Sequence, residues 1–373
     1  MSEIQQRYLA YCAGIAALLQ TVYIVSEVAV GGSISSFEKG QVYIGTLMLL
    51  VIGAIFLGEY KKELPYILKK HCISLSIGGL LFISTLFPWS NTKIAIVSDI
   101  AALSVWAFLL KNEKIRKYIQ EIYCGGLVLL ILLGLWQVIT GSIFSSTLLG
   151  MAGKNVSDLG VAVLQFDNLR ILRAYGFLEH PNNFGAYALL LWLFSCIEIS
   201  EIKRRIFQWV AIVGIVISMS RTAALSWILA GGSWWIAITV AAVLLIRYKD
   251  YFFEESSGER IEQFKQWAAM YKTFAWEGTG VGNYARYVRE YMEVKQGYAV
   301  QLIHNSFLLI LSEWGIVRVM TMYAVLRKKI SVSSLNFFII PLPMLLFDHF
   351  LYATHSGRLW WFGFIVYWYT KKN

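Results

Sequence analysis

The residues best suited to chemistry are histidines and arginines that lie where polar loops meet apolar runs. In QLIHNSFLLILSEWGI (301–316), His304 and Asn305 stand where a charged loop ends and a strongly apolar run begins. Histidine accepts a proton from a hydroxyl group near neutral pH, and the planar guanidinium group of arginine donates two parallel hydrogen bonds to phosphate oxygens. Together these residue types predict a reaction in which an alcohol displaces a phosphate leaving group.

Arginine, histidine and amide side chains recur at the ends of other apolar runs. Such groups are costly in lipid, so several of them on one face favour a functional site. The alternatives are that a single arginine extends to lipid headgroups and that a single histidine is structural. We expect the following residues on one outer face: Arg170, Arg173, His180, Asn182, Asn183, Arg221, Arg286, Arg289, His304, Asn305, Asp348, His349, His355 and Arg358.

The segments that position these residues are predicted to be membrane helices. The chain has 373 residues, of which 57% are hydrophobic and 15% charged, whereas a soluble domain carries about 25% charged residues. Its net charge of +10 comes from basic clusters between apolar runs, which indicates membrane topology rather than nucleic-acid binding. The expected fold class is all-α integral membrane, with residues 1–373 forming a single polytopic domain.

The apolar runs predict about twelve transmembrane helices, because about 20 apolar residues cross a hydrocarbon core of about 30 Å. Helix length favours two crossings over residues 206–246, whereas the distribution of positive charge favours three with a turn near Gly231, and we expect three. With a cytoplasmic N-terminus, two larger loops face outward, at about 141–182 and about 247–303, and the second contains a helix along the membrane surface. The other expected helices span about 8–30, 41–58, 72–89, 94–110, 120–140, 183–199, 304–326, 332–350 and 357–370.

Neither a nucleotide nor a metal is expected to bind. The glycines of GTGVGN (278–283) read G-x-G-x-G without a surrounding strand–helix unit, so this segment predicts a tight turn that presents the next helix. Glu38 is the only acidic residue in the first outer loop, 31–40. Because divalent metals such as Mg²⁺ need several oxygen ligands, we expect no metal and no other cofactor.

Three stretches carry a family resemblance: RAYGFLEHPNNFGAYALL (173–190), SMSRTAAL (218–225), and GTGVGNY (278–284) followed by HNSFLLILSEWGI (304–316). Together they resemble the O-antigen ligase/polymerase superfamily of bacterial membrane glycosyltransferases. Ligases of that superfamily carry His, a small amide or hydroxyl residue, nine residues, Gly, two more, and then Gly, Thr or Tyr. His304, Asn305 and Gly315 fit this spacing, whereas Arg318 departs from the last position.

The resemblance implies a GT-C-like, metal-independent enzyme of the bacterial inner membrane whose site faces the periplasm. It implies an undecaprenyl-diphosphate-linked glycan as donor, an acceptor glycolipid or glycan such as lipid A-core, contact with membrane lipids, and no nucleic acid. A polymerase that joins lipid-linked repeat units is the alternative, and a glycolipid transporter is less favoured because the two halves of the chain look unlike. The expected catalytic residues are His304 as general base with Arg173, Arg221 and Arg286, and the expected substrate-binding residues are Arg170, Arg289, His180, Asn182, Asn305 and Asp348.

Overall fold

The computed structural model of the chain describes residues 1–26, 29–30, 33–34, 38–59, 93–158, 160–166, 169–198, 200–231, 255–291, 300–326 and 338–372. It is mostly helical (69%). Within the described residues, two stretches are long and apolar enough to cross a membrane: α5 (Glu113–Thr140) and the segment Ser306–Ala324. The helix expected at 72–89 lies outside the described residues.

The N-terminal segment differs from the expected helix at 8–30. Helix α1 (Glu3–Ala16) starts at a capping box formed by Ser2 and Gln5 and ends well before residue 30. The next residues, VYIVS, form β1 (Val22–Ser26), which pairs antiparallel with β4 (Gly40–Tyr43). The short β2 (Ala29–Val30) and β3 (Ser33–Ile34) lie between β1 and β4 in sequence and pair with each other. The β-branched and aromatic residues of β1 favour an extended backbone. Helix α2 (Ile44–Glu59) begins directly after β4.

The centre of the molecule is a helical core around α6 (Pro181–Ser195), α5, α4 (Lys93–Leu109) and α16 (His355–Lys372). Helix α6 begins with His180 as N-cap and Pro181 in its first turn. Its residues are buried nearly all round, as expected of a helix that is apolar on every face. The helices expected at 94–110, 120–140, 183–199 and 357–370 are therefore present with shifted ends, and the aromatic residues Trp106, Tyr123, Phe184 and Trp360 fill the space between them.

The predicted outer loop at 141–182 contains strands, so the all-α expectation is wrong for this segment. Gly141, with φ of 64°, ends α5 in the left-handed conformation. Two antiparallel hairpins follow: β5 (Ser142–Ile143) with β6 (Lys154–Asn155), and β7 (Val163–Phe166) with β8 (Leu169–Leu172). Pairing satisfies backbone groups that a long loop would otherwise leave to water.

Residues 206–246 contain a break that the hydropathy pattern did not predict. Helix α7 (Glu201–Ser218) ends at Met219, whose φ is 52°, and Ser220 caps the short α8 (Arg221–Leu229). A turn follows at Gly231, with φ of 85°, near the expected position. Residues 232–246 lie outside the described residues, so the expected third crossing is not tested.

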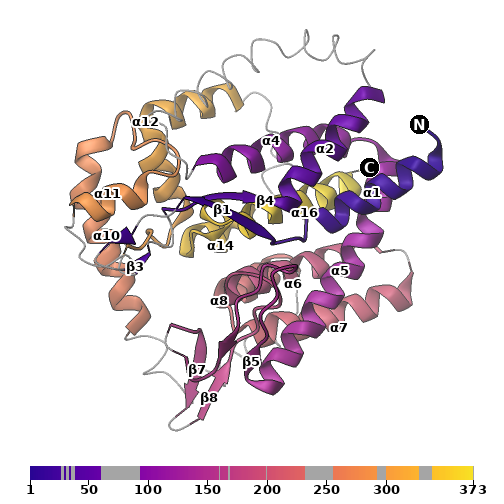
Figure 1. Cartoon of the computed structure of the whole chain (residues 1–373), viewed down its shortest axis with the longest axis horizontal. Helices are drawn as coiled ribbons and strands as arrows, with labels where there is room; N and C mark the ends of the chain where they lie inside the picture. Colours follow the sequence, from indigo (N-terminus) through magenta and orange to yellow (C-terminus); the bar gives the residue numbers. More distant parts are fainter. Residues whose placement is uncertain are drawn as a thin grey trace.

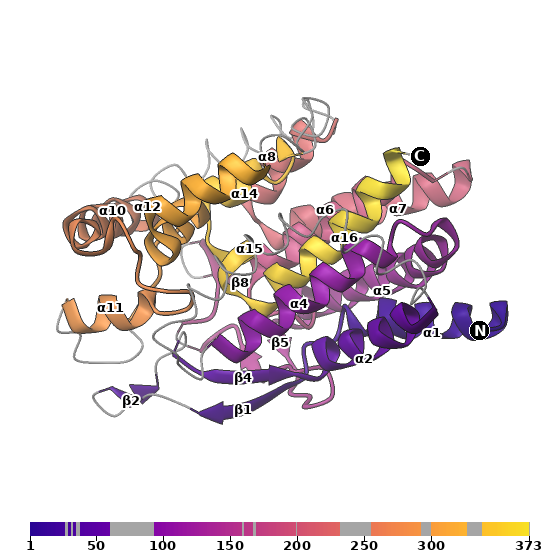
Figure 2. The ribbon, with the colours of Figure 1, turned by 90° about the horizontal axis from the view of Figure 1, so that it is seen from above.

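The remaining helices build the end of the molecule opposite to its termini, where Figure 1 shows α10 (Glu255–Phe274), α11 (Tyr284–Tyr291) and α12 (Ser306–Leu326) gathered together. The hairpin of β1 and β4 extends toward this end in both views (Figure 2). The prediction of a single helix at 332–350 is wrong over residues 338–350, which the structure describes. There, α14 (Leu342–Phe347) and α15 (Phe350–Ala353) are separate, and Asp348 is extended between them.

The GTGVGN segment is the tight turn that was predicted. Gly278, Gly280 and Gly282 all have positive φ, and α11 starts directly after Asn283. The turn packs on a break inside α12 at Gly315, which has φ of 71° and ψ of 159°. Backbone bonds from Thr279 N to Ser312 O and from Gly280 N to Glu313 O join the two segments. Arg318 holds the same junction, because its Nη1 donates to the carbonyls of Glu277 and Trp314.

Candidate functional site

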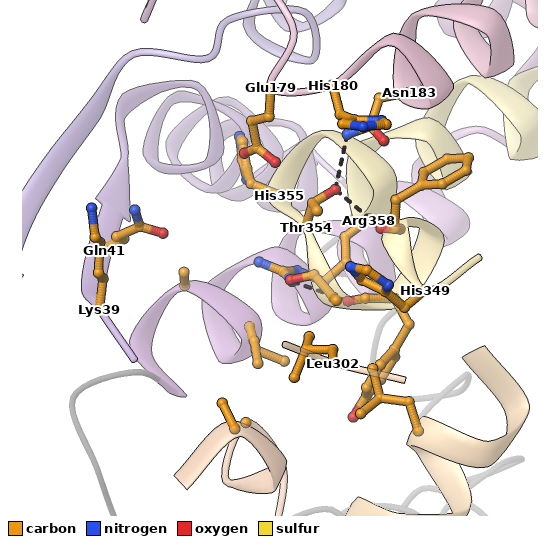
Figure 3. Close-up of a pocket in the computed structure, with 18 of the residues that line it drawn as sticks. Lys39, Gln41, Glu179, His180, Asn183, Leu302, His349, Thr354, His355 and Arg358 are labelled. Atoms are coloured by element: carbon orange, nitrogen blue, oxygen red, sulfur yellow. Dashed lines mark hydrogen bonds between the residues drawn. The ribbon is translucent and has the colours of Figure 1, made fainter. Parts of the chain in front are cut away.

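A pocket of about 660 Å³ lies where the β4 hairpin, the start of α6, α11, the start of α12 and the α14–α16 segment meet. Figure 3 shows its lining side chains, which come from segments far apart in the sequence. Many polar residues singled out from the sequence line this pocket: His180, Asn182, Asn183, His304, Asp348, His349, His355 and Arg358.

His304 is held in one orientation by α10. Its Nδ1 lies 2.7 Å from Gln263 Oε1, and its backbone N–H also donates to that oxygen at 3.3 Å. Because the amide oxygen only accepts, Nδ1 carries the ring proton and Nε2 carries the lone pair. The ring packs edge-on against His349 at 4.8 Å between centroids. This arrangement suits Nε2 to accept a proton.

Asp348 is the anion beside these histidines. Its Oδ2 accepts from Asn182 Nδ2 at 2.6 Å, and its backbone carbonyl accepts from both the N–H and the hydroxyl of Ser306 at the start of α12. Burial raises the pKa of the Asp348 carboxyl, but His349, His180, His304 and the Asn182 hydrogen bond lower it overall. Asp348 therefore remains a carboxylate near neutral pH.

Arg173 lies behind the pocket wall rather than in it. Its Nη2 donates to Asn182 Oδ1 at 2.9 Å and its Nε to the carbonyl of Ser218 at 2.9 Å. Arg173 thereby orients Asn182, which in turn contacts Asp348. Desolvation and the charge of Arg173 lower the pKa of His180 to about 3. His180 Nδ1 accepts from the backbone N–H of Asn182, as a neutral ring does.

Five other predicted site residues, Arg221 among them, do not line the pocket. Arg286 is exposed and pairs with Glu290 at 2.7 Å. Arg289 forms a bidentate pair with Glu38 at 3.0 to 3.2 Å, which ties α11 to the β hairpin. The others are Arg170, which donates to the carbonyl of Ser157, and Asn305, which caps α12 and donates to the carbonyl of Leu346.

Arg221 meets a second arginine that the sequence pattern did not single out. Arg260 of α10 acts on Arg221 by charge repulsion, and neither arginine lines the pocket. Arg260 also acts on His349: burial lowers the pKa of His349, Asp348 opposes this shift, and the charge of Arg260 adds to it. Arg260 and Gln263 are three residues apart on one helix, so they share a face. The predicted surface helix thus supplies both a cation and the partner of His304, and only three-dimensional packing reveals this.

The opposite wall contains a buried ion network built on Asp99 of α4. Asp99 Oδ2 accepts from Arg358 Nε at 2.8 Å, and His355 Nδ1 lies 3.0 Å from both carboxylate oxygens. The hydroxyl of Thr46 also donates to Asp99. The Tyr43 ring stacks on His355 with 3.4 Å between centroids. Asp99 was not predicted, although an acidic residue inside the helix expected at 94–110 is itself a signal of function.

One trio of described residues could supply metal ligands. The side-chain ligand atoms of His304, Asp348 and His349 all lie within 4.8 Å of one another. The sequence pattern did not predict this cluster. Two of the three already have protein partners, since Gln263 contacts His304 and Asn182 donates to Asp348.

No protein-family model and no curated protein sequence matches the chain. Its function is therefore inferred from the residues of the pocket and their geometry.

Proposed function

We propose that this chain is a multi-pass glycosyltransferase of the bacterial inner membrane, with about twelve transmembrane helices and its pocket on the periplasmic face. It transfers a glycan from an undecaprenyl-diphosphate donor to an acceptor hydroxyl without a metal ion. The high hydrophobic content of the chain, 57%, and its basic clusters support the membrane location. The three motifs that resemble the O-antigen ligase/polymerase superfamily support the donor class.

The observation that carries the proposal is an oriented histidine whose partner, Gln263, shares helix α10 with one of two arginines that repel each other. Gln263 fixes the tautomer of His304, and Arg260, on the same face of α10, lies near Arg221. Two arginines that repel each other are stabilised when a dianion such as a diphosphate binds between them. A base next to a diphosphate site is what glycosyl transfer to an alcohol requires.

The reaction follows from these positions. The acceptor hydroxyl donates its proton to His304 Nε2 while its oxygen attacks the anomeric carbon of the donor sugar. The bond between that carbon and the diphosphate oxygen breaks, and its electron pair leaves with undecaprenyl diphosphate. Arg221 and Arg260 stabilise the charge that develops on the leaving group. A single direct displacement inverts the anomeric configuration.

A ligase and a polymerase would share this chemistry and differ in the acceptor. Arg318 stands where ligases usually have Gly, Thr or Tyr. Here its Nη1 donates to the carbonyl of Glu277, which joins the broken part of α12 to the glycine-rich turn. We favour the ligase because His304, Asn305 and Gly315 keep the ligase spacing. Purified protein incubated with lipid-linked repeat units alone gives a ladder of longer products if it is a polymerase. A ligase gives product only after an acceptor glycolipid is added.

His304→Ala tests the proposed base. Removal of a general base costs about 10²–10⁴-fold in rate, so transfer should become undetectable while membrane insertion and folding persist. Arg205→Ala is the matched control, because Arg205 is exposed on α7, where it pairs with Glu201 one turn away. Normal transfer by a well-folded His304→Ala protein would refute the assignment.

Arg221→Ala and Arg260→Ala test the diphosphate site. Each removes one charge-assisted contact, worth about 1.5–3 kcal/mol, so kcat/KM should fall about 10- to 150-fold in each variant. Arg205→Ala removes the same charge far from the pocket and should retain wild-type kcat/KM. Unchanged kinetics in both arginine variants would place the diphosphate elsewhere.

A further inference from the structure

His355 has a ring nitrogen that the proposed transfer does not use. Its Nδ1–H donates to the Asp99 carboxylate, so Nε2 carries the lone pair. His355 is only 1% exposed, yet it lines the pocket, and Nε2 has no hydrogen-bond partner within the described part of the chain. Buried acceptors are rarely left unsatisfied, and each such atom needs an explanation.

The surroundings of His355 are hydrogen-bonding groups, with Lys39 beside Gln41 across the pocket (Figure 3). In Figure 3 Glu179 lies beside His355, with Gln41 on the strand across the pocket. The Tyr43 hydroxyl donates to Gln41 Oε1 at 3.1 Å and lies 3.5 Å from Glu179 Oε1. The charge of Arg358 is balanced by Asp99 at 2.8 Å. Lys39 and Glu179 have opposite charges, so this part of the pocket has no net charge and suits hydroxyl groups.

We propose that His355, Glu179 and Gln41 form a subsite for an uncharged sugar residue of the glycan, in which His355 Nε2 accepts a hydrogen bond from a sugar hydroxyl. The inference rests on the proposed function, because it concerns the glycan that the pocket takes. A few convergent polar groups on a concave wall provide specificity for a bound ligand in this way. Asp99 fixes the His355 tautomer, so the subsite selects a hydroxyl donor.

Two substitutions at His355 separate recognition from structure. In His355→Asn, the side-chain amide takes the place of Nδ1, so the contact with Asp99 is kept and the group that faces the sugar is lost. In His355→Gln, the amide takes the place of Nε2, so a polar group still faces the sugar and the Asp99 contact is lost. A purely structural histidine tolerates the first variant better, whereas a recognition residue tolerates the second better.

The kinetic test uses lipid-linked oligosaccharides from the native membrane. We expect His355→Asn to raise KM about 3- to 10-fold, the effect of one neutral hydrogen bond, with kcat little changed. His355→Gln should raise KM less while lowering the midpoint of thermal unfolding more. Gln41→Ala, which leaves the Asp99 network intact, should also raise KM and serves if a His355 variant does not fold. Wild-type KM in both His355→Asn and Gln41→Ala overturns the inference.

A binding measurement distinguishes this inference from the proposed function. Mild acid releases the free oligosaccharide, which has neither diphosphate nor lipid, and its binding to the full chain is followed by saturation-transfer NMR. Binding by wild type that is weakened in His355→Asn supports the subsite even if no transfer occurs, which would refute only the proposed function. Transfer by wild type with equal oligosaccharide binding in wild type and His355→Asn refutes only the subsite.

Discussion

Asp99→Asn is expected to destabilise the protein strongly, because Asp99 is the anion that balances a buried arginine. Asp99 is 0% exposed and Arg358 is 5% exposed. The substitution keeps the shape of the side chain and removes its charge. The new amide group presents N–H donors to a site that now receives donors from Arg358, His355 and Thr46, so at least one buried donor loses its acceptor.

The magnitude follows from the loss of one partner in a buried pair, which costs about 3–5 kcal/mol. Arg358→Met leaves Asp99 without its arginine and also leaves the carbonyls of Tyr352 and Ala353 without the donor Nη1. Its cost should therefore equal or exceed that of Asp99→Asn. Replacing both partners, in Asp99→Asn with Arg358→Met, removes the unbalanced charge and keeps an amide oxygen that accepts from His355 and Thr46. It leaves the two carbonyls without a donor, at about 1–3 kcal/mol each.

The assay is the free energy of unfolding measured by SDS titration of the detergent-solubilised protein. The double variant should be more stable than Arg358→Met alone, although it contains one more substitution. Additive effects, with the double variant the least stable of the set, would refute the reasoning, because they would mean that the two side chains do not balance each other. Arg205→Ala, at an exposed i,i+4 pair with Glu201, should change stability by less than about 0.5 kcal/mol.

Three further predictions concern backbone, catalysis and pH. Gly315→Ala should cost at least about 1–3 kcal/mol in unfolding free energy, because its φ of 71° suits only glycine and a Cβ would press on the Trp276 carbonyl; a stable, wild-type-like variant would contradict the described break. Gln263→Met should lower kcat about 3- to 10-fold by releasing the His304 tautomer, whereas Gln263→Glu should retain activity; equal kcat in all three proteins would exclude this role. The folded-state pKa of His349 is lowered, so its unfolded form binds more protons below about pH 6.5 and stability should fall as pH decreases through this range. His349→Gln should reduce that slope in thermal unfolding measured from pH 7 to 5.

The helices that the sequence predicted best are those formed by long, continuous apolar runs. Segments 94–110, 120–140 and 357–370 form α4, α5 and α16 with moderate shifts at their ends. The clearest failure is the run at 8–30, where VYIVS forms β1 instead of the end of a helix. Hydropathy alone does not distinguish the two, because β-branched and aromatic residues are apolar in either structure and only pairing with β4 decides.

The sequence located the pocket better than it located the arginines. His180, His304 and Asp348 line one pocket because each lies at the end of an apolar segment on the same side of the core. Arg289 has such a position too, but it is paired with Glu38, 251 residues away in sequence. Arg260 had no distinguishing pattern within a charged surface helix. Ion pairing between distant segments depends on packing, which charge patterning along one chain does not encode.

His304 and His355 both line the pocket, but they are not equivalent. Their neighbours decide which of them can act as the general base. Both have Nδ1 facing a protein acceptor, Gln263 for His304 and Asp99 for His355. The base must reach a hydroxyl next to the anomeric carbon, and that carbon is bonded to the diphosphate. Gln263 shares a face of α10 with Arg260, so His304 contacts the helix that carries the cation. His355 instead donates to Asp99 of α4, which also balances the charge of Arg358. The same chemistry therefore assigns proton transfer to His304 and recognition of the sugar to His355, and kcat and KM should separate them.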